Sequence, residues 1–398
     1  MRKYFYLIIY LFFMVSCEDT EEKNCELYEE RGSLISAKKN FEFSKESIAY
    51  QAETFFGVDP ATISIDYAIE VYSVVYQSIG PDDKPVEISG AFYVPVMEEK
   101  KAMPTLSVGH YTNTEQYNVP SVTPNVGPQG LLGAMQGYFT IYADGYGFGV
   151  SAKQPSFVNK KMSAETRIDL LKASKEFACE NDLELNDQLF TTGYSAGGYN
   201  TMAFHQYIEE KYPEFTITAN APLAGPYSTL SMAKTIFEKG VYHQPYYLGF
   251  ALWGYMLGTG DSDALNRWVK EPYRDPILTM YDGSKGATQI NNALNDTVSV
   301  LLQKSFLDGF LGNGEQEFKQ YLKDQSFIYD GWAPKAPIHF MHGKDDTTVY
   351  HSLMEEAATI LKNNGSSQIQ TTTFPGNHNG AAVDCMVQSI NWFNTFKE

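Results

Sequence analysis

One short segment of the chain combines a serine with closely spaced glycines. Residues 193–197 read Gly-Tyr-Ser-Ala-Gly, after the apolar run 189–192 and before a helical pattern over 199–211. A serine at a sharp turn between a strand and a helix presents its hydroxyl above the sheet, and nearby glycines let the backbone pass closely around it. Ser195 is therefore a candidate nucleophile for attack on a carbonyl carbon.

A serine hydroxyl needs a neighbouring base that accepts its proton. His378 lies in the segment Pro-Gly-Asn-His-Asn-Gly, between the last strand pattern and the last helical pattern, where a loop side chain can lean over the edge of the sheet. His205 is ten residues into the helix after Ser195, about 15 Å along its axis, and is expected to be structural. His378 is the candidate base. Packing or surface positions are expected for the remaining histidines that do not lie on a core strand, His110, His243 and His351.

The base in turn needs an acid that fixes its tautomer and stabilises the imidazolium. Residues 342–349 read His-Gly-Lys-Asp-Asp-Thr-Thr-Val and follow the strand pattern 338–341. Asp345 and Asp346 are both candidates for the acid. His339 and His342 are three residues apart on this strand, so they point to opposite faces and cannot share a metal ion.

The surrounding sequence predicts the elements that position these residues. Runs 67–78 and 86–96, rich in Val, Ile and Tyr, flank a Gly-Pro-Asp-Asp turn and predict a hairpin. Short apolar strands then alternate with helices, among them 163–180, which Ser163 can cap, and a last helix with Ala382, Met386, Ile390 and Phe393 on one stripe. Antiparallel strands followed by βαβ units predict an α/β fold: a mostly parallel sheet with helices on both faces. The later predicted strands are 105–108, 139–143, 189–192, 216–219, 338–341 and 369–374.

Residues 227–334 interrupt this alternation. They contain several helical patterns and no clear strand, as expected for a helical cap inserted between two core strands. The apolar run 246–257 within this insertion is too short to span a bilayer. It predicts either a lining for an acyl tunnel or lid, or a helix that packs on the core.

Composition narrows the classes of partner. The 398 residues include 48 acidic and 30 basic side chains, a net charge of −18, so phosphate backbones are repelled and nucleic acid is an unlikely partner. No CxxC spacing indicates a zinc site, and no metal or cofactor is implied. The segment 143–149 is glycine-rich but lacks the G-x-G-x-x-G spacing that leads into a nucleotide-binding helix.

The N-terminal segment resembles a targeting signal. Arg2 and Lys3 precede twelve apolar residues, 4–15, and then Ser16-Cys17, so residues 1–17 are typical of a signal peptide. Residues 14–17, Met-Val-Ser-Cys, resemble a bacterial lipobox, which implies a lipidated Cys17 and a membrane anchor. An acidic tether is expected over 18–40, and it resembles the surface-export signal of Bacteroidota lipoproteins. The implied location is the bacterial outer membrane, with exposure on the cell surface as a further suggestion.

Taken together, the motifs resemble those of the α/β-hydrolase superfamily. The order Ser195, Asp346, His378 is the triad order of that family, and its pattern His-Gly-x-x-Asp-x-x-Val places the acid on Asp346 rather than Asp345. The stretch 191–227 is similar to bacterial relatives of secretory lipases of the Candida lipase A type, and 143–149 resembles their Asp-Tyr-x-Gly-x-Gly segment. The resemblance implies an α/β-hydrolase domain over 41–398, with 227–334 as its cap.

The same resemblance implies an oxyanion hole. One donor is the backbone N–H of Ala196, directly after the nucleophile. The other comes from the loop after the third strand of the fold, where relatives have His-Gly-Thr and this chain has His110-Tyr111-Thr112. Tyr111 is the first candidate and Thr112 the second.

The implied activity is hydrolysis of a small-molecule, lipid or glycan ester through an acyl-enzyme, with no cofactor. Two alternatives differ in class. An aminopeptidase of the same fold would need acidic residues that hold the substrate amine, and no such residue is identifiable. The other alternative is a catalytically inactive surface lipoprotein that binds glycan or lipid. Such a protein would have no esterase activity, so a Ser195→Ala substitution would not change its turnover. The sequence does not indicate the oligomeric state.

The topology implied by the resemblance also bears on the cysteines. Cys179 ends a helix on one face of the sheet and Cys385 lies on the final helix, which covers the other face. A disulfide needs Cα atoms within about 7 Å, so these two cysteines cannot pair. Cys25 on the tether can pair, with Cys179 as the more accessible partner, and Cys385 is expected to stay reduced.

Overall fold

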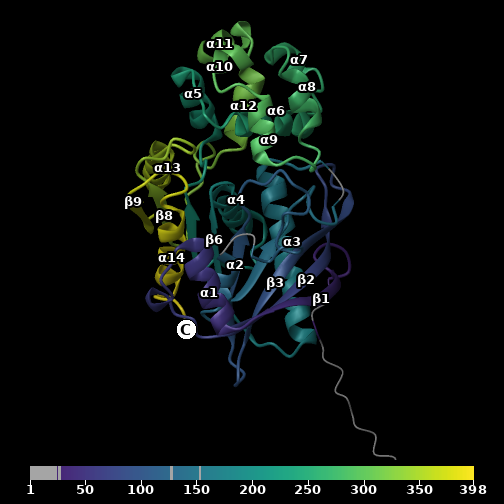
Figure 1. The fold of residues 1–398 in the computed structure, drawn as a ribbon, viewed down its shortest axis with the longest axis vertical. Coiled ribbons are helices and arrows are strands. Elements are labelled where there is room, and N and C mark those ends of the chain that lie inside the picture. Colours follow the sequence, from purple (N-terminus) through teal and green to yellow (C-terminus); the bar gives the residue numbers. More distant parts are fainter. Residues whose placement is uncertain (1–24, 26–27, 126–128, 152–153) are drawn as a thin grey trace, which may run out of the picture.

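The computed structural model describes residue 25 and residues 28–125, 129–151 and 154–398. Its centre is a nine-stranded sheet in the order β1-β2-β3-β5-β4-β6-β7-β8-β9 (Figure 1). The first three strands and the β3–β5 pair are antiparallel, and every later pair is parallel. The strands are β1 Leu34–Phe43, β2 Ala68–Ile79, β3 Pro85–Val96, β4 Met103–Gly109, β5 Phe139–Ala143, β6 Leu185–Tyr194, β7 Ala219–Leu223, β8 Ile338–Gly343 and β9 Ile369–Phe374.

The strand pattern confirms the predicted hairpin and parallel strands, with one displacement. The strand predicted over 216–219 begins at Ala219 instead. Thr218 precedes the strand and is hydrogen-bonded to Leu189 of β6. Its backbone N–H bonds to the Leu189 carbonyl, and its hydroxyl accepts the Leu189 N–H. These bonds hold the chain beside β6 just before the regular β7 ladder starts.

Helices cover both faces of the sheet, as predicted. Apolar side chains of α3 (Lys160–Glu180), α4 (Ala196–Lys211) and α13 (His351–Asn363) pack on one face. Those of α1 (Lys45–Phe56), α2 (Gln129–Ala134) and α14 (Ala382–Phe393) pack on the other. A 3₁₀ turn, Pro60–Thr62, follows α1. The predicted start of α3 at Ser163 is wrong, because the side chain of Asn159 accepts the N–H of Met162 and begins the helix at Lys160.

The inserted cap consists of helices and the loops that join them. Its helices gather beyond one end of the sheet (Figure 1) and form their own apolar cluster. Tyr227 and Phe327 join at its base, where the Phe327 N–H bonds to the Tyr227 carbonyl at 3.1 Å and both side chains pack in the sheet core. The cap helices are α5 Thr229–Lys239, α6 Pro245–Thr259, α7 Ala264–Trp268, α8 Arg274–Thr279, α9 Ala287–Ala293, α10 Val298–Leu301, α11 Lys304–Leu311 and α12 Gln316–Asp324.

The predicted tether over 18–40 is too long. Residues 34–43 form β1, which pairs with the otherwise open edge of β2 and so satisfies the backbone groups of that edge. Cys17 and most of the acidic segment lie outside the described residues, as does the predicted signal peptide. Within the described parts of the chain, no helix is both long enough and apolar enough to cross a bilayer.

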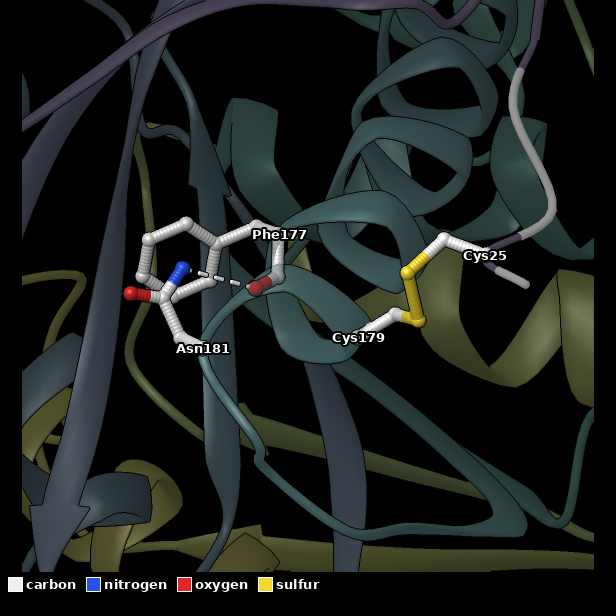
Figure 2. Close-up of a disulfide and its surroundings, with 4 residues drawn as sticks. All are labelled: Cys25, Phe177, Cys179 and Asn181. Atoms are coloured by element: carbon white, nitrogen blue, oxygen red, sulfur yellow. Dashed lines mark hydrogen bonds between the residues drawn. A yellow bond between two sulfur atoms is a disulfide. The ribbon is translucent and has the colours of Figure 1, made fainter. Parts of the chain in front are cut away.

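A disulfide joins the N-terminal segment to the end of α3. Cys25 and Cys179 are bonded with their Cα atoms 5.8 Å apart, beside the turn that Asn181 closes by donating to the Phe177 carbonyl (Figure 2). Cys385 is a free, buried thiol on α14. The cysteine pairing implied by the family topology is therefore confirmed.

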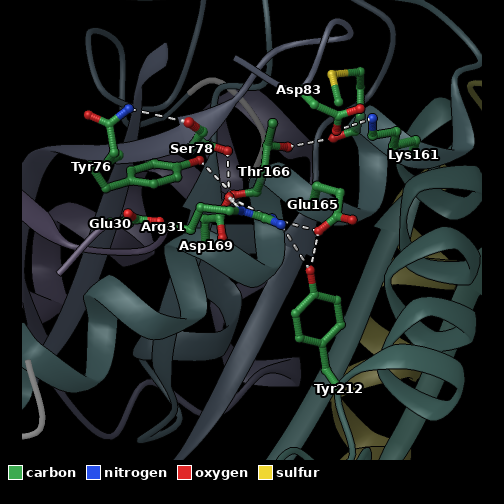
Figure 3. A network of polar contacts seen from close by, with 12 residues as sticks. Glu30, Arg31, Tyr76, Ser78, Asp83, Lys161, Glu165, Thr166, Asp169 and Tyr212 are labelled. Carbon is green, nitrogen blue, oxygen red and sulfur yellow. Dashed lines mark hydrogen bonds and ion pairs between the residues drawn. The ribbon is translucent and has the colours of Figure 1, made fainter. Parts of the chain in front are cut away.

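Arg31 holds the same segment to α3 by charge. Its guanidinium contacts Glu165 at 2.6 Å and Asp169 at 3.0 Å, and the Ser78 hydroxyl donates to Asp169 at 2.7 Å (Figure 3). We call the disulfide and this network the N-terminal clamp, defined by Cys25, Arg31, Glu165, Asp169 and Cys179.

Candidate active site

Ser195 stands at the turn between β6 and α4 with φ 61° and ψ −122°. Such a conformation is costly for a residue with a side chain, and it aims the hydroxyl away from the sheet. The turn can be this tight because Gly197 has no side chain. A Cβ at this position would lie only 2.3 Å from the Gly109 carbonyl oxygen. The same close approach brings the loop after β4 against the nucleophile.

His378 lies in the loop between β9 and α14 and bridges the other two triad residues. Its Nε2 is 2.9 Å from the Ser195 Oγ, and its Nδ1 is 2.6 Å from Oδ2 of Asp346. The Tyr194 hydroxyl donates to the His378 carbonyl and helps to hold the loop. The three side chains are thus connected in the order that serine activation requires, and each residue is at most 8% exposed.

Both carboxylate oxygens of Asp346 have hydrogen-bond partners. Its Oδ1 accepts the backbone N–H groups of Thr348 and Val349 at 2.9 Å each. Burial alone would raise its pKa, but the hydrogen bonds from His342 and His378 outweigh burial and lower the pKa to about 2. The carboxylate is therefore charged at neutral pH and lies 2.6 Å from Nδ1 of His378.

His342 is a partner of the triad acid that the sequence interpretation missed. Its Nε2 lies 3.0 Å from Asp346 Oδ2 and 2.8 Å from the Val349 carbonyl oxygen, so this nitrogen carries a proton and donates to both. The spacing of four residues between His342 and Asp346 in His-Gly-x-x-Asp was a usable signal, because a turn directly after a strand returns the chain toward the strand's last residues.

The competing residues take other positions. Asp345 is exposed, with its backbone N–H bonded to the Gly376 carbonyl. His205 is buried and contacts Glu209 at 3.0 Å, as its predicted structural role requires. His110 is buried against Tyr111, and burial lowers its pKa to about 4. Across the described residues, no group of three or more His, Cys, Asp or Glu side chains is arranged to hold a metal ion.

The two oxyanion candidates of the β4 loop share one pocket. Tyr111 and Thr112 both line it together with Ala196, and Thr112 also lines the cavity that contains Ser195. Ala196 is the first residue of α4, so its N–H has no carbonyl partner within the helix. Both candidates therefore lie near Ala196, Thr112 also lies beside Ser195, and the choice between them stays a prediction.

Two pockets of different chemistry meet at Ala196. The first lies between the sheet and the cap, and almost all of its lining beyond Ser195 is apolar, from α5, α6 and α12: Ile236, Phe237, Leu248, Leu252, Phe318 and Leu322. The second, which we call the polar pocket, combines apolar side chains with hydroxyl, amide and charged groups from the loops after β4 and β5 and from α3 and α4: Asn113, Asp144, Ser163, Arg167 and Asn200. Both lie at the carboxyl ends of parallel strands, where open α/β sheets bind their ligands.

Comparison with known proteins agrees with this arrangement at the level of the fold. No family model and no curated protein sequence matches the chain. Among solved structures, a Legionella pneumophila protein named as a candidate hydrolase superposes with a TM-score of 0.83 at 22% identity, covering 91% of this chain and 98% of that one. The rice cell wall degrading esterase LipA from Xanthomonas oryzae gives a TM-score of 0.82 at 20% identity, with coverage of 92% and 100%. Candida antarctica lipase A in its closed state gives 0.67 at 17%, with coverage of 92% and 82%.

The chain has the α/β-hydrolase fold. In this fold the nucleophile follows the strand next to the centre of the sheet, and the acid and base follow later strands. Here these strands are β6, β8 and β9, and their loops carry Ser195, Asp346 and His378. The cap enters after β7, and residues of its helices α5, α6 and α12 line the cavity that contains Ser195.

Proposed function

We propose that this α/β-hydrolase fold is a serine ester hydrolase that works through an acyl-enzyme. The observation that carries the proposal is the unbroken chain of contacts from Ser195 Oγ through His378 to Asp346. A catalytically inactive binding module has no need for a serine in a strained turn whose hydroxyl meets an imidazole already oriented by a buried carboxylate.

The reaction follows from the positions of the three groups. Ser195 Oγ attacks the ester carbonyl while its proton passes to His378 Nε2. The Asp346 carboxylate beside Nδ1 stabilises the imidazolium that results. His378 then returns the proton to the departing alcohol, and a water molecule activated by the same imidazole cleaves the acyl-enzyme. The N–H groups of Ala196 and Thr112 are the proposed donors to the oxyanion.

The pockets suggest which part of the ester lies where. The apolar pocket under the cap suits the acyl chain, because burying each methylene group gains about 0.8 kcal/mol. The polar pocket suits an alcohol portion that carries hydroxyl or other polar groups. Two of the structural neighbours are named as an ester hydrolase and a lipase, which supports the same reaction class for this chain.

We further propose that the protein acts at the outer membrane of a bacterium, held there by lipid on Cys17. The lipobox-like residues 14–17 support this location. Palmitate labelling of the wild-type protein but not of a Cys17→Ser variant, expressed in a bacterial host, tests the anchor.

The activity is tested with p-nitrophenyl butyrate on the purified protein without its first 17 residues. We expect steady hydrolysis that a Ser195→Ala substitution reduces to the uncatalysed rate. Ser64→Ala is the matched control, because Ser64 is exposed and bonds only to Asp66. Equal activity of the Ser195 variant and the wild type, or none in either across acyl chains of 2 to about 16 carbons, would reject the proposal.

A further inference from the structure

Tyr247 brings a hydroxyl from the cap to the reacting groups. It lies in the first turn of α6 and lines the apolar cavity together with Thr112, Ser195 and Ala196. The hydroxyls of Ser195 and Thr112 lie near enough to its phenol to influence the pKa of Tyr247. It also borders the opening lined by His378 and Asn379. The phenol therefore stands where the nucleophile, the base and the oxyanion loop meet.

The ring is held in this place by its neighbours. Tyr246 packs against it with the ring centroids 4.0 Å apart, and Phe157 lies 6.4 Å away at an interplanar angle of 22°. The backbone of Tyr246 is fixed in turn by Asn291, which accepts its N–H, and by Tyr281, which donates to its carbonyl. A hydroxyl fixed by packing requires no reorganisation when charge develops beside it.

The phenol is a donor at neutral pH. Burial raises the pKa of Tyr247, and it outweighs the nearby hydroxyls of Tyr246, Thr112 and Ser195, which lower the pKa. The hydroxyl thus keeps its proton and can donate a hydrogen bond to an ester oxygen that enters the cavity.

We propose that Tyr247 is a catalytic residue that donates a third hydrogen bond to the oxyanion, beside the N–H groups of Ala196 and Thr112. The inference rests on the proposed ester hydrolase function. When the Ser195 Oγ–carbon bond forms, the carbonyl electron pair moves onto oxygen and the phenol donates to it without losing its proton. When the tetrahedral intermediate collapses, that pair re-forms the carbonyl and the alcohol leaves with the proton from His378. Part of the catalytic machinery therefore belongs to the cap.

Tyr247→Phe tests this directly, because it removes one oxygen and keeps the ring. Loss of one oxyanion donor lowers turnover by about 10²–10³-fold. We expect a fall in kcat of that order for p-nitrophenyl butyrate, with KM changed by less than about threefold. Tyr255→Phe is the matched control, since Tyr255 lies on the same helix but lines neither pocket, and its ring packs on Trp268 and Phe318 with centroids 4.9 and 5.1 Å away. We expect it to stay within about twofold of wild type.

A second readout separates an oxyanion contact from a packing role. An alkyl trifluoromethyl ketone forms a hemiketal oxyanion on the serine, so its affinity should fall in Tyr247→Phe by about the same factor as kcat/KM. Unchanged affinity for this ketone, or turnover equal to or faster than wild type, would overturn the role of Tyr247 and mark it as a spacer or plug. Because wild-type hydrolysis and its loss in Ser195→Ala are measured alongside, such a result would leave the proposed function standing, whereas an inactive wild type would reject that function itself.

Discussion

Asp346 in the active site and Asp169 in the N-terminal clamp are both buried carboxylates, but their partners differ. Asp346 is bonded by two imidazoles and two backbone N–H groups, and its pKa is lowered to about 2. Asp169 is bonded by the Arg31 guanidinium and the Ser78 hydroxyl. Its pKa is raised, because burial outweighs both partners. Burial favours the protonated form of each acid, and the number and kind of donors decide the result.

The comparison separates the site that we propose to move protons from one that holds chain segments together. An imidazole gains and loses a proton near neutral pH, so His378 can carry the Ser195 proton and return it. A guanidinium stays charged, and the pKa of Arg31 is raised still further by Asp169 and Glu165 despite its burial. Chemistry is therefore expected around Asp346 and stability around Asp169.

The largest expected effect is on turnover in the active site. Asp346→Asn removes the charge that orients His378 and favours the wrong imidazole tautomer, so kcat should fall by about 10⁴-fold. Asp169→Asn is the comparison in the clamp and should leave kcat within about threefold, measured with p-nitrophenyl butyrate on folded protein at 25 °C. A similar loss of turnover in both variants would show that the two regions are not functionally distinct.

The next effect is on stability and concerns the disulfide of the clamp. The bond closes a loop of 154 residues, for which the chain-entropy model gives a stabilisation of up to about 5 kcal/mol. Cys25→Ser should therefore lower the denaturant midpoint strongly while kcat stays near wild type. Cys25→Ser and Cys179→Ser should not be additive, because either change alone opens the loop. Additive losses would mean that the two cysteines stabilise the fold independently.

A smaller loss is expected when the arginine of the clamp is replaced. Arg31→Gln leaves the buried Asp169 without its cation and should cost about 2 kcal/mol at pH 7. Its loss raises the folded pKa of Asp169 further, so the folded state holds more protons than the unfolded one above pH about 4, and stability falls as pH rises. Denaturant unfolding at pH 4 and pH 7 should show the larger deficit at pH 7.

Two checks accompany this substitution. Lys39→Gln breaks an exposed pair with Glu70 and is expected to change the unfolding free energy little at either pH. A deficit for Arg31→Gln that is larger at pH 4 than at pH 7 would contradict the rise in the Asp169 pKa expected on loss of the Arg31 cation.

The smallest expected effect is in the active-site loop itself. Asp345 neighbours Asp346 in the chain but is exposed. Asp345→Asn should therefore change kcat by less than about twofold. If Asp345→Asn and not Asp346→Asn abolished turnover, the acid would have been assigned to the wrong residue of the pair.

The sequence predicted the parts of the molecule that depend on neighbours along the chain. The turn around Ser195 and the His-Gly-x-x-Asp loop have fixed spacings, because a strand must end and a helix begin around each functional side chain. The same reasoning predicted the hairpin β2–β3, where two runs rich in Val, Ile and Tyr flank a Gly-Pro-Asp-Asp turn. The parallel strands followed because short apolar runs alternate with helical patterns.

What the sequence did not show depends on contacts between distant residues. β1 reads Leu-Ile-Ser-Ala-Lys-Lys-Asn-Phe-Glu-Phe and is almost entirely exposed, so no alternation of apolar residues identified it as a strand. Its place follows from the free edge of β2. The partners of Arg31 are 134 and 138 residues away in the chain, so no local spacing could indicate the clamp. Tyr247 reaches Ser195 only because the cap folds back over the sheet.

The central claim is that Ser195 is made nucleophilic by His378 and Asp346. Covalent labelling with an alkyl fluorophosphonate, followed by peptide mapping by mass spectrometry, tests it most directly. The structure predicts one label per chain, on the peptide that contains Ser195, with labelling slowed by orders of magnitude in His378→Ala and Asp346→Asn. A label on any other residue, or equal labelling rates in wild type and both variants, would contradict it.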